Sequence, residues 1–275
     1  MRQLAVIAAQ EIRNGLRNFW VGGAIALMLV FSLTLALLGS APGGEVGVSG
    51  LSVLVVSLAS LTIFLLPLIA LLLGHDAIAG EAERGTLALT LSCPVSRRTL
   101  LLGKFLGHFA ILALAATLGF GAAAVTVLTG EGAADGGGIA DFLGLLASAL
   151  LMGAAFLALG TLASVLVRER TTAVGLAIGI WLLFVIVWDL ALLGILVAWG
   201  EVLPEWIVST MILLNPADVF RLLNLTASEA TGLVSGIGPA GAGLAPSLLW
   251  GALLLWFAAP LALAIHALDR KEIGS

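Results

Sequence analysis

The histidines and methionines of this sequence are the side chains that would carry metal chemistry, and their spacing does not suggest it. The three histidines stand in three different apolar segments, at His75, His108 and His266. Three of the methionines are isolated from one another, at Met28, Met152 and Met211. A path for copper through the chain would need repeated soft or imidazole ligands, and the sequence has no Cys-x-x-Cys and no methionine cluster. The sequence therefore predicts neither a metal site nor a cofactor site.

Motifs for catalysis and nucleotide binding are also missing from the sequence. It has no H-E-x-x-H and no Ser/His pair at a recognisable spacing. The phosphate-binding pattern G-x-x-x-x-G-K-[ST] fails at Gly103-Lys104, because Arg98 stands where the first glycine should be and Phe105 follows the lysine. We therefore expect a chain that is not itself an enzyme. If ATP and magnesium drive it, another polypeptide must bind them.

Residues 75 to 104 are the most structured polar segment of the chain. Gly80 and Gly85 are expected to break the preceding helix, and Thr86 is expected to cap a new short helix that ends before Pro94. That helix would expose leucines, which is typical of a docking element for a soluble partner. The alternative is a helix that lies flat on the membrane. The candidate docking residues are Glu81, Glu83, Arg84, Gly85, Thr86, Leu87, Leu89 and Leu91.

Three basic residues follow the short helix, at Arg97, Arg98 and Lys104. They precede a long apolar run, so we expect them to face anionic lipid headgroups.

A second helix start stands at residues 215 to 218, where Asn215 is the expected cap and Pro216 the first helical residue. The apolar residues that follow predict a helix that re-enters the membrane edge or lies on it. It could form a gate or contact a partner on the outer side, and a purely structural interfacial helix is an equal alternative. The candidate residues are Asn215, Pro216, Asp218, Phe220 and Arg221.

Asp189 is the one acid deep in an apolar run, roughly 24 Å along a helix from the run's inner end. An ionised acid at mid-membrane costs about 2.5 to 3.5 kcal/mol, so its side chain should face protein or water. Asp189 is either a residue of a pathway or gate, or a polar group near the outer interface that pairs with a neighbouring helix. We favour the second interpretation slightly.

Long uncharged runs must position all of these residues. Crossing about 30 Å of hydrocarbon takes about 20 helical residues, and six runs are long enough. The composition agrees, because 61% of the residues are hydrophobic and 10% are charged. We therefore predict one all-helical integral membrane domain over residues 1 to 275. The expected spans lie near 19–38, 51–73, 105–129, 140–167, 173–199 and 247–268.

The basic residues orient these spans, because only Arg221 falls on the face opposite the other Lys and Arg residues. The positive-inside rule makes the basic face cytoplasmic, so both termini and residues 75 to 104 are expected inside. The net charge of −4 therefore gives no indication of nucleic-acid binding. The basic face holds Arg2, Arg13, Arg17, Arg84, Arg97, Arg98, Lys104, Arg168, Arg170, Arg270 and Lys271. The outer segments hold Glu45, Glu131, Asp135, Glu201, Glu205, Asp218 and Glu229.

Two further features concern packing. Leu4, Ala8, Ile12 and Leu16 repeat every four residues, which predicts an amphipathic helix in the inner interface, with a solvated basic leader as the alternative. Small residues four apart predict close helix contacts at Gly103/Gly107 and at Gly175/Gly179. The single cysteine, Cys93, excludes an intrachain disulfide.

Residues 75 to 104 resemble the corresponding loop of ABC-type export permeases. The shared pattern is an acidic Gly-Glu, then Gly-Thr-Leu with a run of leucines, a Pro-Val-Ser-Arg turn and a Gly-Lys, and here it begins at Gly80, Gly85, Pro94 and Gly103. The sequence departs from the family pattern at Cys93, where an aromatic residue is expected. The resemblance implies six spans, a coupling helix that seats in a separate cytoplasmic ATPase subunit, and a homodimeric permease in the bacterial inner membrane.

Within that family, residues 64 to 87, 101 to 108 and 213 to 226 resemble the permeases that serve nitrous oxide reductase maturation. This resemblance implies a periplasmic partner and a role in maturing the reductase's copper centres, either by export or by transmitting ATPase motion across the membrane. The lack of a polar ligand path adds weight to the second mechanism. A generic export permease for an unknown substrate remains an alternative. An ion-coupled carrier would need several deep ionisable residues rather than Asp189 alone.

Overall fold

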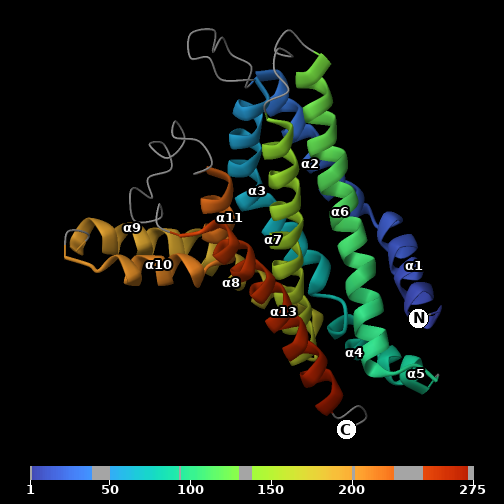
Figure 1. Ribbon diagram of the computed structural model, residues 1–275. Helices are drawn as coiled ribbons and strands as arrows, with labels where there is room; N and C mark the ends of the chain where they lie inside the picture. Colours follow the sequence, from blue (N-terminus) through green and yellow to red (C-terminus); the bar gives the residue numbers. More distant parts are fainter. Residues whose placement is uncertain are drawn as a thin grey trace.

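A computed structural model describes residues 2–38, 50–92, 94–129, 138–199, 202–225 and 244–271, and within these ranges the chain forms a helical bundle (Figure 1). Six helices of the described part are long and apolar enough to cross a membrane, or seven if a bent pair is counted as one span. The predicted all-helical membrane fold is therefore confirmed. The expected positions of Cys93, Glu45, Glu131, Asp135, Glu201 and Glu229 fall outside the described residues.

The expected spans correspond to helices that differ from the predicted bounds mainly at their ends. The third span begins at Arg97 rather than at 105, because the helix continues into the basic segment. The long helices are α2 Phe19–Leu38, α3 Gly50–Gly74, α6 Arg97–Thr129, α7 Ile139–Leu166, α8 Arg170–Leu182 with its continuation α9 Trp188–Trp199, and α13 Pro246–Arg270. The shorter helices are α1 Arg2–Leu16, α4 Ala79–Glu83, α5 Thr86–Ser92, α10 Glu205–Leu213 and α11 Pro216–Leu225.

Helices α3 and α7 form the closest pair at the centre of the bundle. A Cβ atom on Gly74 would stand 2.8 Å from the carbonyl oxygen of Leu157, and one on Gly160 would stand 2.9 Å from that of Leu71. Because only glycine leaves room for this approach, the two backbones touch. The main apolar core forms around this contact, with Phe120, Phe156 and other large side chains fully buried.

Helix α1 lies along the lower half of α6 in Figure 1. Gly103 and Gly107 of α6 face it, so the close contact predicted for this glycine pair is present and its partner is the N-terminal helix. The other pair differs, because no atom of the described chain stands within 4 Å of a Cβ built on Gly175 or Gly179.

A π-helical segment, Leu183–Val187, joins α8 to α9. Helices α9 and α10 project sideways from the bundle (Figure 1). Helices α10 and α11 then meet at a bend of 107°. Such a bend is the geometry of a broken span or of a re-entrant element, so re-entry of α11 stays a prediction.

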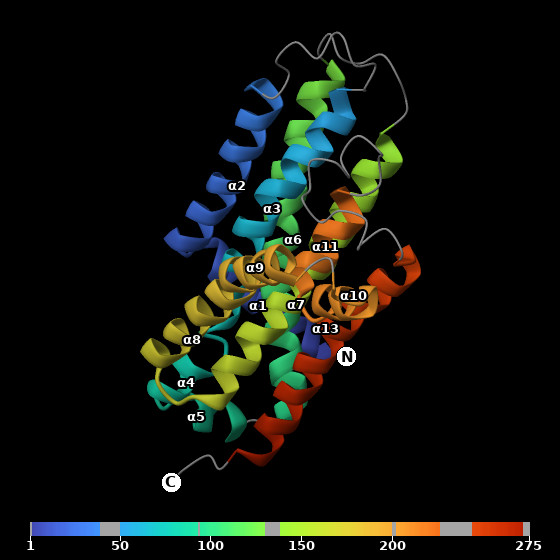
Figure 2. The same cartoon turned by 90° about the vertical axis from the view of Figure 1, so that its left-hand side faces the viewer.

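The start of α1, the end of α13 and the short helices α4 and α5 all lie toward one end of the bundle (Figures 1 and 2). This grouping brings the residues of the expected coupling segment beside the basic residues that flank the spans. The described residues of the segment 75 to 104 therefore share one end of the bundle with the start of α1 and the end of α13.

Candidate coupling site and outer polar cluster

The short helix α4 is held to the bundle by a serine of α7. The hydroxyl oxygen of Ser164 accepts hydrogen bonds from the backbone N–H groups of Ile78 and Ala79, each at 2.9 Å. Both residues are fully buried. The first N–H groups of a helix have no acceptor within that helix, and the Ser164 hydroxyl oxygen supplies the missing acceptor at the start of α4. The start of the coupling segment is thereby fixed to α7.

The turn between α4 and α5 depends on Gly85 alone, which corrects the expectation that Gly80 also breaks the helix. Gly85 has a φ of +71°, where a side chain would be strained, whereas Gly80 lies inside α4. Thr86 does not cap α5 either, because its hydroxyl donates to the carbonyl oxygen of Glu81 at 3.3 Å. The turn therefore depends on a glycine conformation rather than on a side-chain cap.

The three leucines of α5 have different surroundings. Leu87 is buried, in a small apolar cluster with Ile78, Leu101 and Leu268. Leu91 is partly buried against the same cluster. Leu89 is 71% exposed. Helix α5 is therefore anchored by one leucine and presents another, so the exposed apolar contact centres on Leu89.

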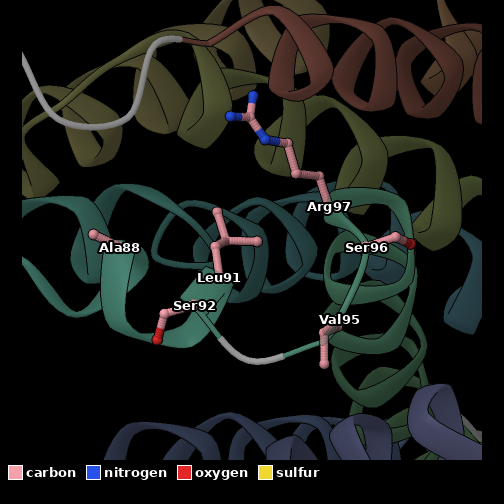
Figure 3. A pocket seen from close by; sticks show the side chains of 6 residues that line it. All are labelled: Ala88, Leu91, Ser92, Val95, Ser96 and Arg97. Carbon is pink, nitrogen blue, oxygen red and sulfur yellow. The ribbon is translucent and has the colours of Figure 1, made fainter.

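A cavity of about 430 Å³ opens between α5 and the start of α6 (Figure 3). Its lining consists of Ala88, Leu91, Ser92, Val95, Ser96 and Arg97. The guanidinium group of Arg97 extends away from the cavity in Figure 3, because it donates to the carbonyl oxygens of Leu268, Asp269 and Lys271 at the end of α13. Helix α5 therefore carries both an exposed leucine, Leu89, and part of the wall of a cavity.

The two acidic candidates, Glu81 and Glu83, also differ in exposure. Glu83 is exposed and accepts a hydrogen bond from the backbone N–H of Arg170 at 2.7 Å. Glu81 instead turns inward, and its Oε1 lies 2.8 Å from Nζ of Lys104. Among the remaining candidates, the exposed ones are Arg84, Gly85 and Thr86. The surface available to a partner is therefore narrower than the predicted set.

The basic residues of this region pair with protein groups. Buried Lys104 departs from the expected contact with lipid headgroups, whereas the Arg98 side chain stays 70% exposed. Arg98 forms an ion pair with Asp269 at 2.8 Å, and Arg97 caps α13. The side chain of Lys104 is only 7% exposed. Their carboxylate and carbonyl partners lie far away in the sequence, so no local pattern indicates them.

The outer helix α11 starts as predicted, because Oδ1 of Asn215 accepts from the backbone N–H of Ala217 at 3.0 Å. The amide nitrogen of Asn215 donates to the carbonyl oxygen of Phe184 at 2.8 Å and to Asp218 at 2.9 Å. Asn215 and Asp218 are fully buried. The cap of α11 is therefore tied to the π-helical segment.

Arg221 lies on the next turn of α11 and connects two carboxylates. Its guanidinium group contacts Asp218 at 3.0 Å and Asp189 of α9 at 2.9 and 2.5 Å. Phe220, on the same helix, is fully buried, and Pro216 is buried. All five residues predicted for the outer side thus point into the subunit or pair within it. Asp189 has the neighbouring-helix partner that the structural interpretation requires.

The described part of the chain contains no group of three or more His, Cys, Asp or Glu side chains arranged to hold a metal ion. In the residues that the structure describes, the polar clusters around Lys104 and around Arg221 consist of ion pairs and hydrogen bonds.

Comparison with known proteins covers nearly the whole chain. Residues 5–273 match the family described as ABC-2 family transporter protein. A probable ABC transporter permease protein NosY of Stutzerimonas stutzeri is 43% identical over 277 residues, which cover 99% of this chain and 100% of that protein. A probable ABC transporter permease protein NosY of Pseudomonas aeruginosa is 45% identical over 272 residues, which cover 97% of each chain.

Proposed function

Since this chain belongs to the ABC-2 family of transporter proteins, we propose that it is the permease of an ATP-driven complex that supports maturation of the copper centres of nitrous oxide reductase. Membership of the family makes it a multi-pass permease subunit of the inner membrane. The two relatives carry the name of the permease subgroup that residues 64 to 87, 101 to 108 and 213 to 226 resemble. The reductase role rests on that name and on those segments.

The cytoplasmic ATPase is proposed to dock on the exposed side of α5. The observation that carries this proposal is the anchored helix with a projecting Leu89, 71% exposed, beside the cavity of about 430 Å³. An apolar side chain that stands in solvent on a rigid support is a suitable anchor for a partner's groove. ATP and magnesium would be bound by that partner, because this sequence lacks the phosphate-binding motif.

Of the two mechanisms, we propose that this subunit transmits motion to a periplasmic partner. The coupling helices are fixed to α7 through Ser164, and α7 is in turn connected to α11, because the amide of Asn224 donates to Oγ of Ser148 at 2.9 Å. A continuous set of packed helices is the kind of element that carries such coupling. The residues first considered for partner contact would then brace α11 from within, and the contact itself would be made elsewhere.

The permease is proposed to function as a homodimer with both termini in the cytoplasm. The span Arg170–Trp199 has little of its surface covered by the rest of the described chain, and its Gly175 and Gly179 lie open. Small residues at this spacing let a second helix approach closely. Native mass spectrometry of the purified complex measures this stoichiometry directly.

The test of ATPase docking is Leu89→Asp, with Leu89→Met as the matched control. A charge placed in an apolar groove without a partner costs several kcal/mol, and since about 1.4 kcal/mol is tenfold, affinity should fall by more than tenfold. Co-purification in mild detergent measures how much ATPase remains bound. We expect Leu89→Met to retain the ATPase and Leu89→Asp to lose it. Wild-type stoichiometry in Leu89→Asp would refute docking at α5.

The test of the biological role is the copper content of nitrous oxide reductase in a strain that lacks this gene. We expect the reductase to be made and exported without its full copper complement. Complementation with Leu89→Met should restore copper, and Leu89→Asp should not. A normally metallated reductase in the deletion strain would remove the reductase role and leave an export permease of another cargo.

A further inference from the structure

Lys104 joins three helices that are far apart in the sequence. Its Nζ lies 2.6 Å from Oε1 of Glu11 on α1 and 2.8 Å from Oε1 of Glu81 on α4. The three side chains are 7%, 18% and 19% exposed for Lys104, Glu11 and Glu81. One buried cation thus holds the N-terminal helix and the coupling segment at the same point.

The glycines of α6 bring Glu11 to this point. A Cβ atom on Gly103 would stand 2.8 Å from Cβ of Ile7, and one on Gly107 would stand 2.5 Å from Cβ of Glu11. Since neither position has room for a larger residue, α1 sits directly on the α6 backbone. The contact places Glu11 within reach of Lys104 and within 3.7 Å of His108 Nε2.

Helix α1 has few other attachments within the described chain. None of its residues is buried, so its own apolar packing is shallow. At its start the side-chain amide of Gln3 donates to the carbonyl oxygen of Pro94, in the turn that follows α5, at 3.0 Å. The helix therefore contacts the coupling segment at both places where it has a polar anchor.

The charges make the connection between the two helices obligatory. A buried cation that faces two carboxylates attracts both, and removal of one carboxylate leaves the other pair intact. If α4 moved without α1, Lys104 would have to leave one carboxylate unpaired in a site with little access to water, which is costly. Movement of α1 and α4 together with the part of α6 that carries Lys104 keeps both pairs.

We propose that Lys104 is a positioning residue that makes α1 move with the coupling helices when the ATPase binds ATP. This inference rests on the proposed docking of an ATPase at α5. It assigns to the N-terminal helix a part in the motion.

The experiment measures the movement of α1 in the complex with the ATPase. Spin labels are attached to cysteines at Gln10 on α1 and His266 on α13, both exposed, in a Cys93→Ser background. The label-to-label distance is measured without nucleotide and with ATP under non-hydrolysing conditions. Glu81→Gln removes the link to α4 while it leaves the pair of Glu11 with Lys104. The matched control is Glu169→Gln, because the exposed Glu169 side chain accepts from the hydroxyl of Thr172 rather than pairing with Lys104 and lies outside the proposed docking set.

We expect ATP to shift the distance in the parent protein and in Glu169→Gln, and the shift to disappear in Glu81→Gln. The nucleotide-free distance should be the same in all three, which a merely structural role of Glu81 would not produce. If Glu81→Gln fails to fold, Glu11→Gln cuts the other link and should also abolish the shift.

An unchanged shift in Glu81→Gln, or no shift in the parent protein with its ATPase bound, would overturn the inference. Failure of the ATPase to bind the parent protein would instead contradict the proposed function. The two failures are therefore distinguishable in the same preparation.

Discussion

Arg221 and Asp189 form a two-point ion pair across 32 residues of sequence, with distances of 2.9 Å from Nη1 to Oδ1 and 2.5 Å from Nη2 to Oδ2. Arg221 is the one basic residue that the sequence places opposite the basic face, and Asp189 is the one acid deep in an apolar run. Each of these two exceptional charges therefore has the other as its partner. The pair joins α11 to α9.

Asp189→Asn is expected to weaken this joint and lower the thermal stability of the detergent-solubilised protein. Removing one partner of a buried ion pair costs about 3–5 kcal/mol when the other charge is left unpaired, and the loss should be smaller here because Arg221 keeps Asp218 and the Asp189 side chain is 28% exposed. Arg221→Lys keeps the charge without the two-point geometry, so its loss should be intermediate. The control is Glu205→Gln, because Glu205 of α10 is exposed. An unchanged melting temperature in Asp189→Asn would show that the pair contributes nothing.

Ser164→Ala is expected to loosen the coupling helices while the long helices remain folded. It leaves the buried N–H groups of Ile78 and Ala79 without a partner, at a cost of about 1–3 kcal/mol each. Hydrogen exchange of residues 76 to 92 should speed up, and ATPase affinity should fall. Ser60→Ala is the matched control, because the Ser60 hydroxyl bonds only the Val56 carbonyl of its own helix. Equal exchange rates in the two variants would contradict the anchoring role of Ser164.

Membrane orientation is predicted from the basic residues and is tested by cysteine labelling in a Cys93→Ser background. Val202 follows α9 and is 83% exposed, and Leu89 of α5 is 71% exposed. We expect a membrane-impermeant thiol reagent added to spheroplasts to modify a cysteine at Val202 and to spare one at Leu89. In cells that lack the ATPase, where nothing covers α5, both should react after the membrane is permeabilised. Labelling of the Leu89 position from outside would reverse the orientation.

Properties that depend on local pattern were predictable from the sequence. The six spans follow from apolar run length against the thickness of the hydrocarbon, and the start of α11 follows from Asn215 and Pro216. The short helix before Pro94 follows from Gly85 and its leucines, although Gly80 was misassigned as a breaker. These features are set by residues within one or two turns of each other, so they are readable without the fold.

Tertiary structure decided where the charged side chains go and which leucine is exposed. The partners of Lys104 are Glu11 and Glu81, and that of Asp189 is Arg221; in each case the sequence supplies both charges but nothing that pairs them. Leu87 is buried and Leu89 is exposed because α5 rests on α6 and α13 through one side of a helix only seven residues long. Periodicity cannot select a buried side in so short a helix, whereas helix packing can. The same packing places α1 against Gly103 and Gly107, and this contact brings Glu11 to Lys104.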